Sequence, residues 1–413
     1  MAKPVRDIIV IGGSHAGLFS AIALQNAGFR VRVFERAPEI LRGTGAGIRV
    51  QPLLADILRR EAGIDPQQFS TRTHFDRHLA PRRESAVNRV IHERAEEGSF
   101  ASWGSLYRAL LARFGGEHYI HGESCTGTTE AGDKVEVEFE SGRREVADLV
   151  VFADGIGSGG RQRLNPSARL QYVGYVAWRG LLSEAELSTE TRAVLKDARI
   201  FVVPGLSHVI LYPVPGEPGL DGAGELRINA IWYRNVAGGA ELDQLMTDRE
   251  GVHRATSLKA GMLKKRYINQ FHLDVESELP PAAVEVFSRC EPFITTINDV
   301  EPSRMVFGRQ VLIGDAAAAT RPHVSASTAR ALRAAWGLAD ALRATKNSAD
   351  LGANLAAWER EHLAIAQEFT QRGRMIGNRL QVDGTYVPGA PELTQITMPV
   401  GASVVAEARR GRS

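Results

Sequence analysis

The chain has 413 residues, which is longer than one average domain and indicates two or three. Its 44% hydrophobic and 24% charged residues are typical of globular proteins and exclude a disordered or fibrous chain. The 50 Lys and Arg residues against 48 Asp and Glu leave a net charge of +2, so nucleic acid is not indicated as a partner. The two cysteines suit a reducing compartment, and neither a signal peptide nor a membrane helix is recognisable, which predicts a cytoplasmic protein without membrane contact.

The first predicted unit is a βαβ motif. Residues 7–11 (DIIVI) are a continuous apolar run, as expected of a parallel strand that is buried on both faces. A glycine turn comes next, and residues 16–27 then read as an apolar helix that ends at Gly28. Residues 30–34 (RVRVF) form a second strand, which ends at Glu35.

After this unit, the sequence becomes richer in predicted strands. Residues 170–300 are rich in strand-like sequence separated by turns, and a buried strand of the first kind returns at 311–314. The other predicted elements are strands over 134–139 and 148–152 and helices over 52–62, 105–114, 328–345 and 351–380. Residues 382–413 are rich in Pro and Gly, and we expect a solvated surface arm there, not a binding element. The fold class is therefore mixed α/β: a Rossmann-like domain, an inserted β-sheet domain and C-terminal helices.

The turn at residues 12–17 (GGSHAG) has the G-x-G-x-x-G spacing, with Ser14 in the second glycine slot. Gly12 would make the tight turn, Gly17 would let helix and strand pack closely, and the helix N-terminus would face a pyrophosphate. Glu35 comes eighteen residues after Gly17, where a carboxylate accepts hydrogen bonds from ribose hydroxyls. This context predicts dinucleotide binding; the alternative is a glycine turn that serves packing alone.

Two further motifs come directly after buried strands. Asp154-Gly155 comes after the strand 148–152, and Gly314-Asp315 comes after the strand at 311–313. Asp-Gly after a strand is often only a turn. An Asp at the carboxyl end of a strand can also bind a sugar hydroxyl, and a helix that starts beyond it directs N–H groups at an anion. The order and spacing of the motifs carry more information than either motif alone.

Taken together, these motifs make the sequence resemble the group A flavin-dependent aromatic hydroxylases, which have the para-hydroxybenzoate hydroxylase fold. The resemblance runs from Ile8 to about Arg379. Within the family, a subgroup acting on dihydroxypyridines is the most similar, through the GGS form of the turn and through further short segments. These segments are GTGAG (43–47), GIRVQP (47–52), YVAWRG (175–180), WYRNVA (232–237), LMTD (245–248) and RPH (321–323).

The resemblance implies FAD as the cofactor, with NADH or NADPH as a transient co-substrate, because no second Rossmann unit is present. It implies that the pyrophosphate meets Gly12, Gly13, Ser14, Ala16 and Gly17. It assigns the adenosine ribose to Glu35, and the ribityl chain to Asp315 beside Gly314. Pro322 would lie near the reactive edge of the flavin. The remaining residues assigned to FAD are Arg36, Gln51, Cys125, Asp154, Gly155, Ser325 and Ser327, of which Asp154 and Gly155 would also meet NAD(P)H.

The resemblance also divides the chain into parts. It implies an FAD-binding domain of residues 1–70, 100–165 and 300–345, a β-rich substrate domain of residues 71–99 and 166–299, a C-terminal helical segment (346–381) and a tail (382–413). The expected partners are a small aromatic substrate and O2, and a homodimer is left open. The remaining histidines, among them His74, His78 and His92, lack metal-ligand spacing, so we expect no metal.

The sequence departs from the family pattern around the expected flavin. Most members have a glycine-rich loop ending in Asn after the Gly-Asp motif, whereas this chain has VSASTAR at 324–330. Because serines and a threonine replace flexible glycines, we expect this loop to avoid positive φ angles. Arg333-Ala334 replaces an acidic pair, and Trp103 stands where many members have an FAD-binding Arg. These changes bear on FAD affinity more than on the fold.

Candidate catalytic residues lie on a strand at 208–214 and beside Pro322. Alternation along the strand places His208, Ile210 and Tyr212 on one face, with Val209 and Leu211 on the other. Val214 matches the position of the family's substrate-carboxylate arginine, so the substrate need not carry a carboxylate. His323 is the titratable group expected nearest the flavin, where it could act as a base on a phenol or hydroxypyridine. The alternative is a histidine that hydrogen-bonds its own loop.

The predicted function is an FAD-dependent monooxygenase that hydroxylates an electron-rich aromatic or N-heteroaromatic ring, with NAD(P)H as reductant. The resemblance implies that O2 adds at flavin C4a and that the ring attacks the distal oxygen of the resulting hydroperoxide. Two alternatives stay open: an FAD reductase or oxidase on the same fold, and a flavin-binding protein without turnover. A simple NAD-dependent dehydrogenase would explain neither the Asp154-Gly155 motif nor the Gly314-Asp315 motif.

Overall fold

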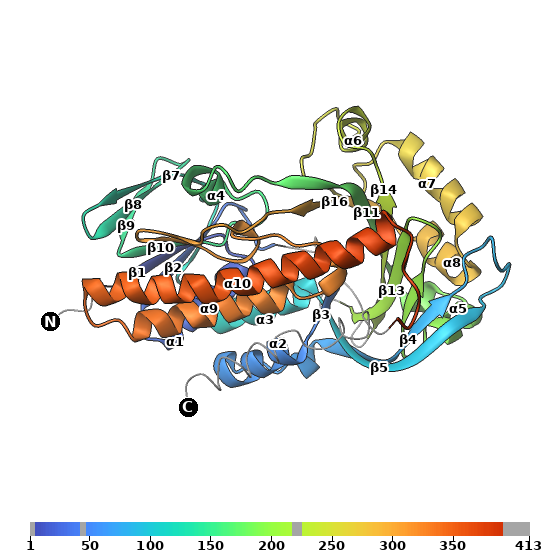
Figure 1. Ribbon diagram of the computed structural model, residues 1–413, viewed down its shortest axis with the longest axis horizontal. Coiled ribbons are helices and arrows are strands. Elements are labelled where there is room, and N and C mark those ends of the chain that lie inside the picture. The colour runs from blue at the N-terminus through green and yellow to red at the C-terminus, as the bar shows by residue number, and fades with distance from the viewer. Residues whose placement is uncertain (1–4, 42–46, 217–224, 391–413) are drawn as a thin grey trace.

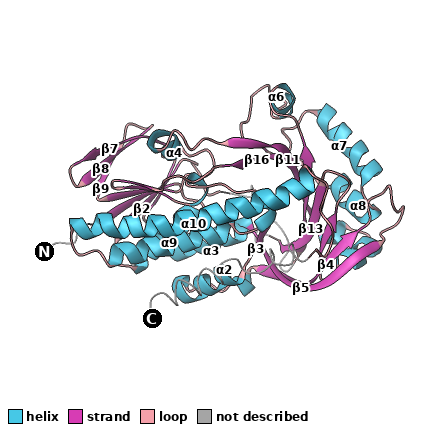
Figure 2. Cartoon of the chain, viewed as in Figure 1, coloured by secondary structure: helices cyan, strands magenta, loops and turns pink. Residues whose placement is uncertain are grey.

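The computed structural model describes residues 5–41, 47–216 and 225–390. The GTGAG loop predicted to belong to the family pattern lies, apart from Gly47, outside the described residues. The chain forms an elongated molecule with a parallel sheet and its helices at one end and a large mixed sheet at the other (Figure 1). Figure 2 shows the long helices running beside the first sheet and the large sheet beyond them. No helix in the described part of the chain is both long and apolar enough to cross a membrane.

A six-stranded sheet has the order β17-β18-β10-β1-β2-β6, and all of its pairs are parallel except β17–β18. Its strands are β1 (Asp7–Ile11), β2 (Arg30–Glu35), β6 (Tyr119–His121), β10 (Leu149–Phe152), β17 (Val306–Phe307) and β18 (Gln310–Leu312). The apolar runs predicted as buried strands are confirmed as β1, β10 and β18, because helices cover both faces of a parallel sheet.

The helices around this sheet are close to those predicted. They are α1 (His15–Asn26), α2 (Pro52–Ile57, continued by a π-helical turn over Leu58–Ala62), α3 (Trp103–Phe114), α4 (Gly159–Leu164), α9 (Ser327–Arg343) and α10 (Ser348–Gln381). Helix α1 is buried along most of its length because it packs against α3, α9 and the sheet. The 34-residue α10 packs on α9 and reaches from the parallel sheet to the large sheet (Figure 1). A small sheet of β7 (Cys125–Ala131), β8 (Lys134–Phe139) and β9 (Arg144–Ala147) lies at the end of the molecule away from the large sheet (Figure 1).

The large sheet has nine strands in the order β15-β16-β11-β14-β13-β12-β4-β5-β3. They are β3 (Gly47–Arg49), β4 (Ser70–Leu79), β5 (Val90–Ser102), β11 (Gln171–Ser183), β12 (Ala198–Val202), β13 (His208–Pro215), β14 (Leu226–Asn235), β15 (Ser257–Leu258) and β16 (Phe293–Asp299). The pair β12–β4 is parallel and the other pairs are antiparallel. Strands from residues 47–102 therefore join strands from residues 171–299 in one sheet.

Four helices cover the outer face of the large sheet: α5 (Thr189–Leu195), α6 (Ala240–Leu245), α7 (Lys265–Glu278) and α8 (Pro281–Arg289). The sequence prediction of strands and turns throughout 170–300 was wrong for α7 and α8. Helix α7 buries Phe271 and Val275 against the sheet, and the Phe271 ring stacks on Trp178 at 4.4 Å between centroids. The apolar residues of α7 recur at helical spacing in the sequence, but the charged residues between them made this spacing hard to recognise.

The two faces of β13 have different environments. Val209 and Leu211 lie in the hydrophobic core under the outer helices, whereas Tyr212 belongs to a separate cluster on the inner face. The alternation predicted for this strand is therefore confirmed. The inner face of the sheet is closed in part by the segment after α10. Tyr386 in this segment hydrogen-bonds to His78 of β4 at 2.8 Å, so the prediction of a purely solvated arm was wrong for residues 382–390.

Candidate active site

The glycine turn between β1 and α1 is held by close backbone contacts. Gly12 has φ +98°, and a Cβ there would lie 2.5 Å from the carbonyl oxygen of Ala153. A Cβ at Gly17 would lie 1.8 Å from the Gly12 oxygen, so both positions require glycine. Ser14 is the N-cap of α1, but its side chain makes no capping hydrogen bond. The first turn of α1 therefore keeps N–H donors for an anion.

A buried carboxylate borders this turn. Glu35, at the end of β2, is 7% exposed, and its two oxygens accept hydrogen bonds from Gly13 N at 2.7 Å and Ala37 N at 2.9 Å. Arg36 beside it is exposed. Glu35 thus supports the backbone of the turn from behind while its carboxylate stays at the carboxyl edge of the parallel sheet. This is the place where the sequence predicted a ribose-binding acid.

The Asp154-Gly155 and Gly314-Asp315 motifs are joined in space. Asp154 accepts hydrogen bonds from Ser158 Oγ and from Gly160 N, which fixes the start of α4. Arg161 on α4 is 2% exposed and donates to the carbonyl oxygens of Asp315 and Ala316, both at 3.2 Å. Motifs that are far apart in the sequence are therefore linked through one guanidinium, which supports reading them as parts of one site.

A second buried guanidinium lies beside Asp315. The Arg330 side chain, 3% exposed, approaches Asp315 Oδ1 at 3.8 Å, while the Asp315 side chain is 47% exposed. Burial lowers the pKa of both Arg161 and Arg330, and the Nε of each lacks a hydrogen-bond partner among the described residues. The N-cap of α9, Ala326, also has no capping side chain. Two uncapped helix N-termini and two incompletely paired buried cations fit an anionic, pyrophosphate-bearing cofactor such as FAD.

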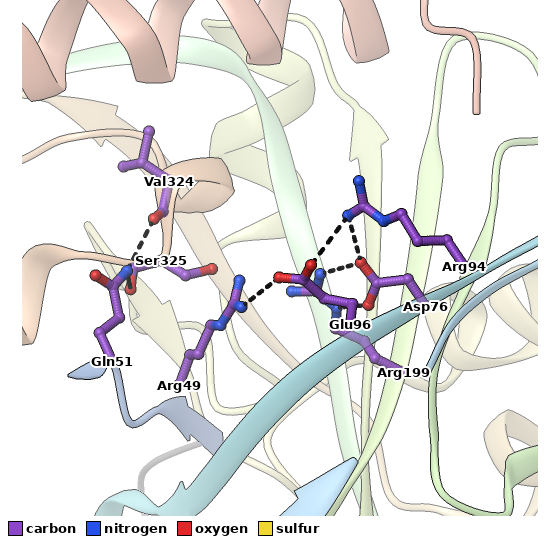
Figure 3. Close-up of polar contacts among 8 residues, drawn as sticks. All are labelled: Arg49, Gln51, Asp76, Arg94, Glu96, Arg199, Val324 and Ser325. Carbon is purple, nitrogen blue, oxygen red and sulfur yellow. Dashed lines mark hydrogen bonds and ion pairs between the residues drawn. The ribbon is translucent and has the colours of Figure 1, made fainter. Parts of the chain in front are cut away.

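The loop after Pro322 is pinned by a buried glutamine. Gln51 donates from Nε2 to the carbonyl oxygens of Ser325 at 2.7 Å and Val324 at 3.4 Å (Figure 3). Ser325 has φ +48°, so the prediction that this loop avoids positive φ was wrong. A serine in this conformation costs roughly 1–2 kcal/mol relative to glycine, and the Gln51 hydrogen bond to its carbonyl helps to hold it. Ser327 begins α9.

Two other residues predicted near the cofactor lie further out or differ in chemistry. Cys125 on β7 is half-buried, and its sulfur accepts a hydrogen bond from Arg163 of α4 at 3.5 Å. Burial raises the pKa of the Cys125 thiol. Trp103 begins α3 and lies against the ring of His15, with 4.7 Å between centroids. Burial lowers the pKa of His15 to about 4, so this imidazole does not replace the positive charge that many family members have at Trp103.

A cavity of about 250 Å³ lies between the inner face of the large sheet and the loop after Pro322. His208, Tyr212 and His323, the three predicted catalytic residues, all line it, as do Pro322, Ser325 and Ser327. Ile210 and Ile231 form an apolar part of its wall, and Tyr386 and Gly389 contribute from the segment after α10. The structure therefore brings the catalytic candidates together around one cavity.

His323 is oriented by a residue of the large sheet. Its Nε2 lies 2.7 Å from the hydroxyl of Tyr175 on β11, and the positive charge of Arg321 is close to both residues. Tyr175 donates to Nε2 when the proton of neutral His323 is on Nδ1, and accepts from Nε2 in the other tautomer. Burial and the nearby Arg321 lower the pKa of His323 to about 3. The alternative interpretation, a histidine bonded to its own loop, is not supported by this geometry.

His208 and Tyr212 have different partners. Gln381 donates from Nε2 to His208 Nδ1 at 2.7 Å, so the imidazole proton is on Nε2, which has no partner among the described residues. Burial holds the pKa of His208 well below its ordinary value, and its ring lies 5.1 Å from that of His323. Tyr212 donates to the Gly47 carbonyl at 2.9 Å, and burial raises its pKa. Tyr212 therefore forms part of the cavity wall, and its hydroxyl proton is used in the hydrogen bond to β3 instead of being free for acid catalysis.

A ladder of alternating charges was missed by the sequence analysis. Arg199 donates twice to Asp76, at 2.9 and 2.7 Å, and Arg94 also donates to Asp76 at 3.1 Å. Glu96 pairs with Arg49 at 3.0 Å and with Arg94 at 3.7 Å (Figure 3). Burial would raise the pKa of Asp76, but the two arginines hold it below its ordinary value. We call these five residues the charge ladder; all but Glu96 line the cavity.

Comparisons with known proteins agree with this arrangement. Residues 172–299 match the family described as FAD binding domain-like. The chain is 35% identical over 390 residues to 2,6-dihydroxypyridine 3-monooxygenase of Paenarthrobacter nicotinovorans, covering 94% of this chain and 95% of the relative. It is 29% identical to the FAD-dependent urate hydroxylase of Klebsiella pneumoniae, with 89% and 88% covered.

A solved structure shows the same fold along nearly the whole chain. The 2,6-dihydroxypyridine-3-hydroxylase of Arthrobacter nicotinovorans superposes with a TM-score of 0.87 at 32% identity, covering 95% of this chain and 97% of that one. The motifs, the joined Asp-Gly elements and these similarities lead to one conclusion. The chain belongs to the group A FAD-dependent aromatic hydroxylases, which are NAD(P)H-dependent monooxygenases.

Proposed function

We propose that this FAD-dependent monooxygenase hydroxylates an electron-rich phenol or hydroxypyridine in the cavity beside Pro322, with NADH or NADPH and O2 as co-substrates. The observation that carries the proposal is the position of the His323–Tyr175 pair. It joins the loop after the Gly314-Asp315 motif to the inner face of the large sheet at 2.7 Å. A ring bound there would contact both the cofactor loop and the sheet.

The residues that would hold FAD are the glycine turn, Glu35, Asp154, Asp315 and the amides at the start of α1 and α9. When bound, FAD supplies the transfer of reducing equivalents from NAD(P)H to O2 and the insertion of one oxygen atom. We propose that the parallel sheet with its helices is the FAD-binding domain and that most of the large sheet is the substrate domain. The strand β3 (Gly47–Arg49) is an exception, because it comes from the range 1–70 expected for the FAD-binding domain but pairs with β5 of the large sheet.

The protein's own contribution is binding and orientation. Ile210 and Ile231 offer an apolar surface for a planar ring, and the side chain of Tyr386 helps to keep water out. We propose that Tyr175 donates to Nε2 of His323 and that His323 orients a substrate oxygen by donating from Nδ1. A histidine with a pKa of about 3 accepts a proton poorly at neutral pH, so orientation is favoured over general-base catalysis.

The test is a coupled measurement on the FAD-loaded protein. Hydroxypyridines and phenols are screened for faster NADH or NADPH oxidation, and hydroxylated product and hydrogen peroxide are quantified together. Product formed in near-equal amount to the NAD(P)H oxidised supports the proposal. Oxidation that yields only peroxide identifies a reductase or oxidase, and FAD binding without any stimulated oxidation identifies a flavin-binding protein without turnover.

We also propose that the protein acts in the cytoplasm. Cys125 and Cys290 are both free thiols in the structure, which suits a reducing compartment. Cell fractionation with detection of the untagged protein tests this location.

A further inference from the structure

Two buried tyrosines, neither of them among the predicted cofactor residues, reach the glycine turn. Tyr119 on β6 donates from its hydroxyl to the carbonyl oxygen of Gly13 at 3.0 Å, and the hydroxyl of Tyr107 on α3 lies 3.2 Å from that of Tyr119. Since Tyr119 has one hydroxyl proton and uses it on the carbonyl, Tyr107 is the donor to Tyr119. A chain of two phenol hydroxyls therefore ends on one backbone oxygen of the turn.

The surroundings of Tyr119 keep its hydroxyl in this role. Tyr107 is 0% exposed and Tyr119 is 5% exposed, so water does not compete for their hydroxyls. Burial raises the pKa of Tyr119, and its hydroxyl therefore stays protonated and able to donate. A Cβ at Gly13 would lie 2.1 Å from the Tyr119 oxygen, so the hydroxyl occupies the space that a side chain at Gly13 would need.

Gly13 is held at both of its peptide groups. Its N–H donates to Glu35 at 2.7 Å, and its carbonyl accepts from Tyr119. Because a trans peptide is planar, the N–H of Ser14 points away from the Gly13 carbonyl, and hence away from Tyr119. This N–H has no acceptor among the residues that the structure describes, and Ser14 is only half-buried. The hydrogen bond from Tyr119 therefore fixes the direction of a free amide donor at the start of α1.

We infer that Tyr119 is a positioning residue for FAD, which with the help of Tyr107 aims the Ser14 N–H at the FAD pyrophosphate. Glycine permits more backbone conformations than any other residue, so the peptide that joins Gly13 to Ser14 could otherwise turn over. A reversed peptide would present its carbonyl oxygen to the anion in place of its N–H. The inference concerns FAD alone and does not depend on the substrate proposed above.

The experiment removes one hydroxyl and keeps the ring. FAD binding to the apoprotein is measured by fluorescence titration, and the unfolding free energy of the apoprotein by denaturant titration. Tyr119→Phe should raise the dissociation constant of FAD about 5- to 50-fold. Tyr172→Phe is the matched control, because Tyr172 on β11 also donates to a backbone carbonyl, that of Val236 at 2.9 Å, but in the large sheet. It should lose comparable stability and keep the native affinity for FAD.

A double-variant cycle separates positioning from a general loss of stability. Tyr107→Phe leaves the bond from Tyr119 to Gly13 in place but removes its supporting donor, so it should weaken FAD binding less, by about 2- to 5-fold. Since Tyr107 acts only through Tyr119, the double variant should bind FAD as Tyr119→Phe does, with no further loss. If Tyr119→Phe does not fold, Tyr107→Phe alone keeps the test.

The opposite results are equally definite. Native FAD affinity in Tyr119→Phe, or in Tyr107→Phe where that variant stands alone, overturns the inference. So does a loss of FAD affinity in Tyr172→Phe that matches the loss in Tyr119→Phe, because the effect would then follow stability. Losses that add in the double variant would show that Tyr107 acts independently of Tyr119. None of these measurements uses a substrate, so their failure leaves the proposed hydroxylation standing.

Discussion

The Arg161 guanidinium donates to the backbone carbonyl of Asp315 at 3.2 Å, and this contact ties the Asp154-Gly155 motif to the Gly314-Asp315 motif. Arg161 also donates to the carbonyls of Ala316 and Ile156, so one side chain satisfies three backbone acceptors in two loops. A residue that is 2% exposed and has this many acceptors cannot be replaced without leaving several of them unpaired. The positions of the two loops therefore depend on the same side chain.

Arg161→Met should therefore give a folded protein that is less stable by about 1–3 kcal/mol and binds FAD more weakly. Thermal unfolding and a fluorescence titration with FAD measure the two effects. Arg163→Met is the matched control, because Arg163 is an exposed residue on the same helix. Equal effects of the two substitutions would show that Arg161 does not organise the site.

Glu35→Ala should weaken FAD binding by roughly 10- to 100-fold, since Gly13 N and Ala37 N lose their acceptor and the ribose loses a carboxylate. The dissociation constant is measured by FAD titration of the apoprotein. Glu39→Ala, four residues further on and exposed, should leave it unchanged. An unaltered constant in Glu35→Ala would show that the acid has only a local backbone role.

His323→Ala should retain FAD but lower kcat about 10- to 100-fold through loss of substrate orientation. Tyr175→Phe should reproduce part of this loss, because the phenol hydroxyl fixes the imidazole. Since the pKa of His323 is about 3, the kcat profile of the native enzyme should show no histidine titration between pH 5 and 9. A limb near pH 6–7 that disappears in His323→Ala would instead identify a general base.

Stability should fall as the pH is lowered from 7 to 5. Burial lowers the pKa of His15 and His78 to about 4 and of His362 to about 3, whereas the unfolded value is 6.5. In this window the unfolded chain binds more protons than the folded one, so each such group costs about 2 kcal/mol at pH 5. His362→Met removes one of these groups, and its unfolding free energy should depend less on pH by that amount. An unfolding free energy that changes equally between pH 7 and 5 in both proteins would contradict this.

Tyr386→Ala should open the cavity wall and raise the share of NAD(P)H oxidation that ends as hydrogen peroxide several-fold, because water then reaches the reacting centre. Tyr386→Phe loses only the hydrogen bond to His78 and should stay close to the native enzyme. Val387→Ala, at an exposed neighbouring position, is the control. Peroxide and product are quantified in the same reaction.

Much of the parallel sheet could be predicted because its signals are local. A continuous apolar run such as residues 7–11 marks a strand that is buried on both faces, and the Gly12–Gly17 turn predicts the helix that begins beyond it. The alternation along β13 correctly placed His208 and Tyr212 on one face. Each of these patterns is complete within a short stretch of chain, so no knowledge of distant packing is needed.

The charge ladder could not be predicted in the same way. Arg199 and Asp76 are 123 residues apart, and they meet only because β12 pairs in parallel with β4. Nothing in the sequence around either residue distinguishes it from a solvated charge. Ser325 is a similar case, since it has a positive φ and its carbonyl accepts a hydrogen bond from Gln51, far away in the chain. Residues whose roles are set by distant partners are the ones that sequence patterns miss.

The short segment that carries Tyr386 and Gly389 belongs to none of the three sheets described above, yet it supplies part of the cavity wall. The segment takes part in no strand pairing, and Tyr386 packs against a small hydrophobic cluster, whereas Val382 and Val387 are exposed, so substitutions at these two valines cost little in folding free energy. A lineage of such hydroxylases could therefore alter the size of the ring it accepts by varying residues 382–390. Changes on the floor of the cavity are constrained by neighbouring strands, whereas this segment can diverge quickly between enzymes with different substrates.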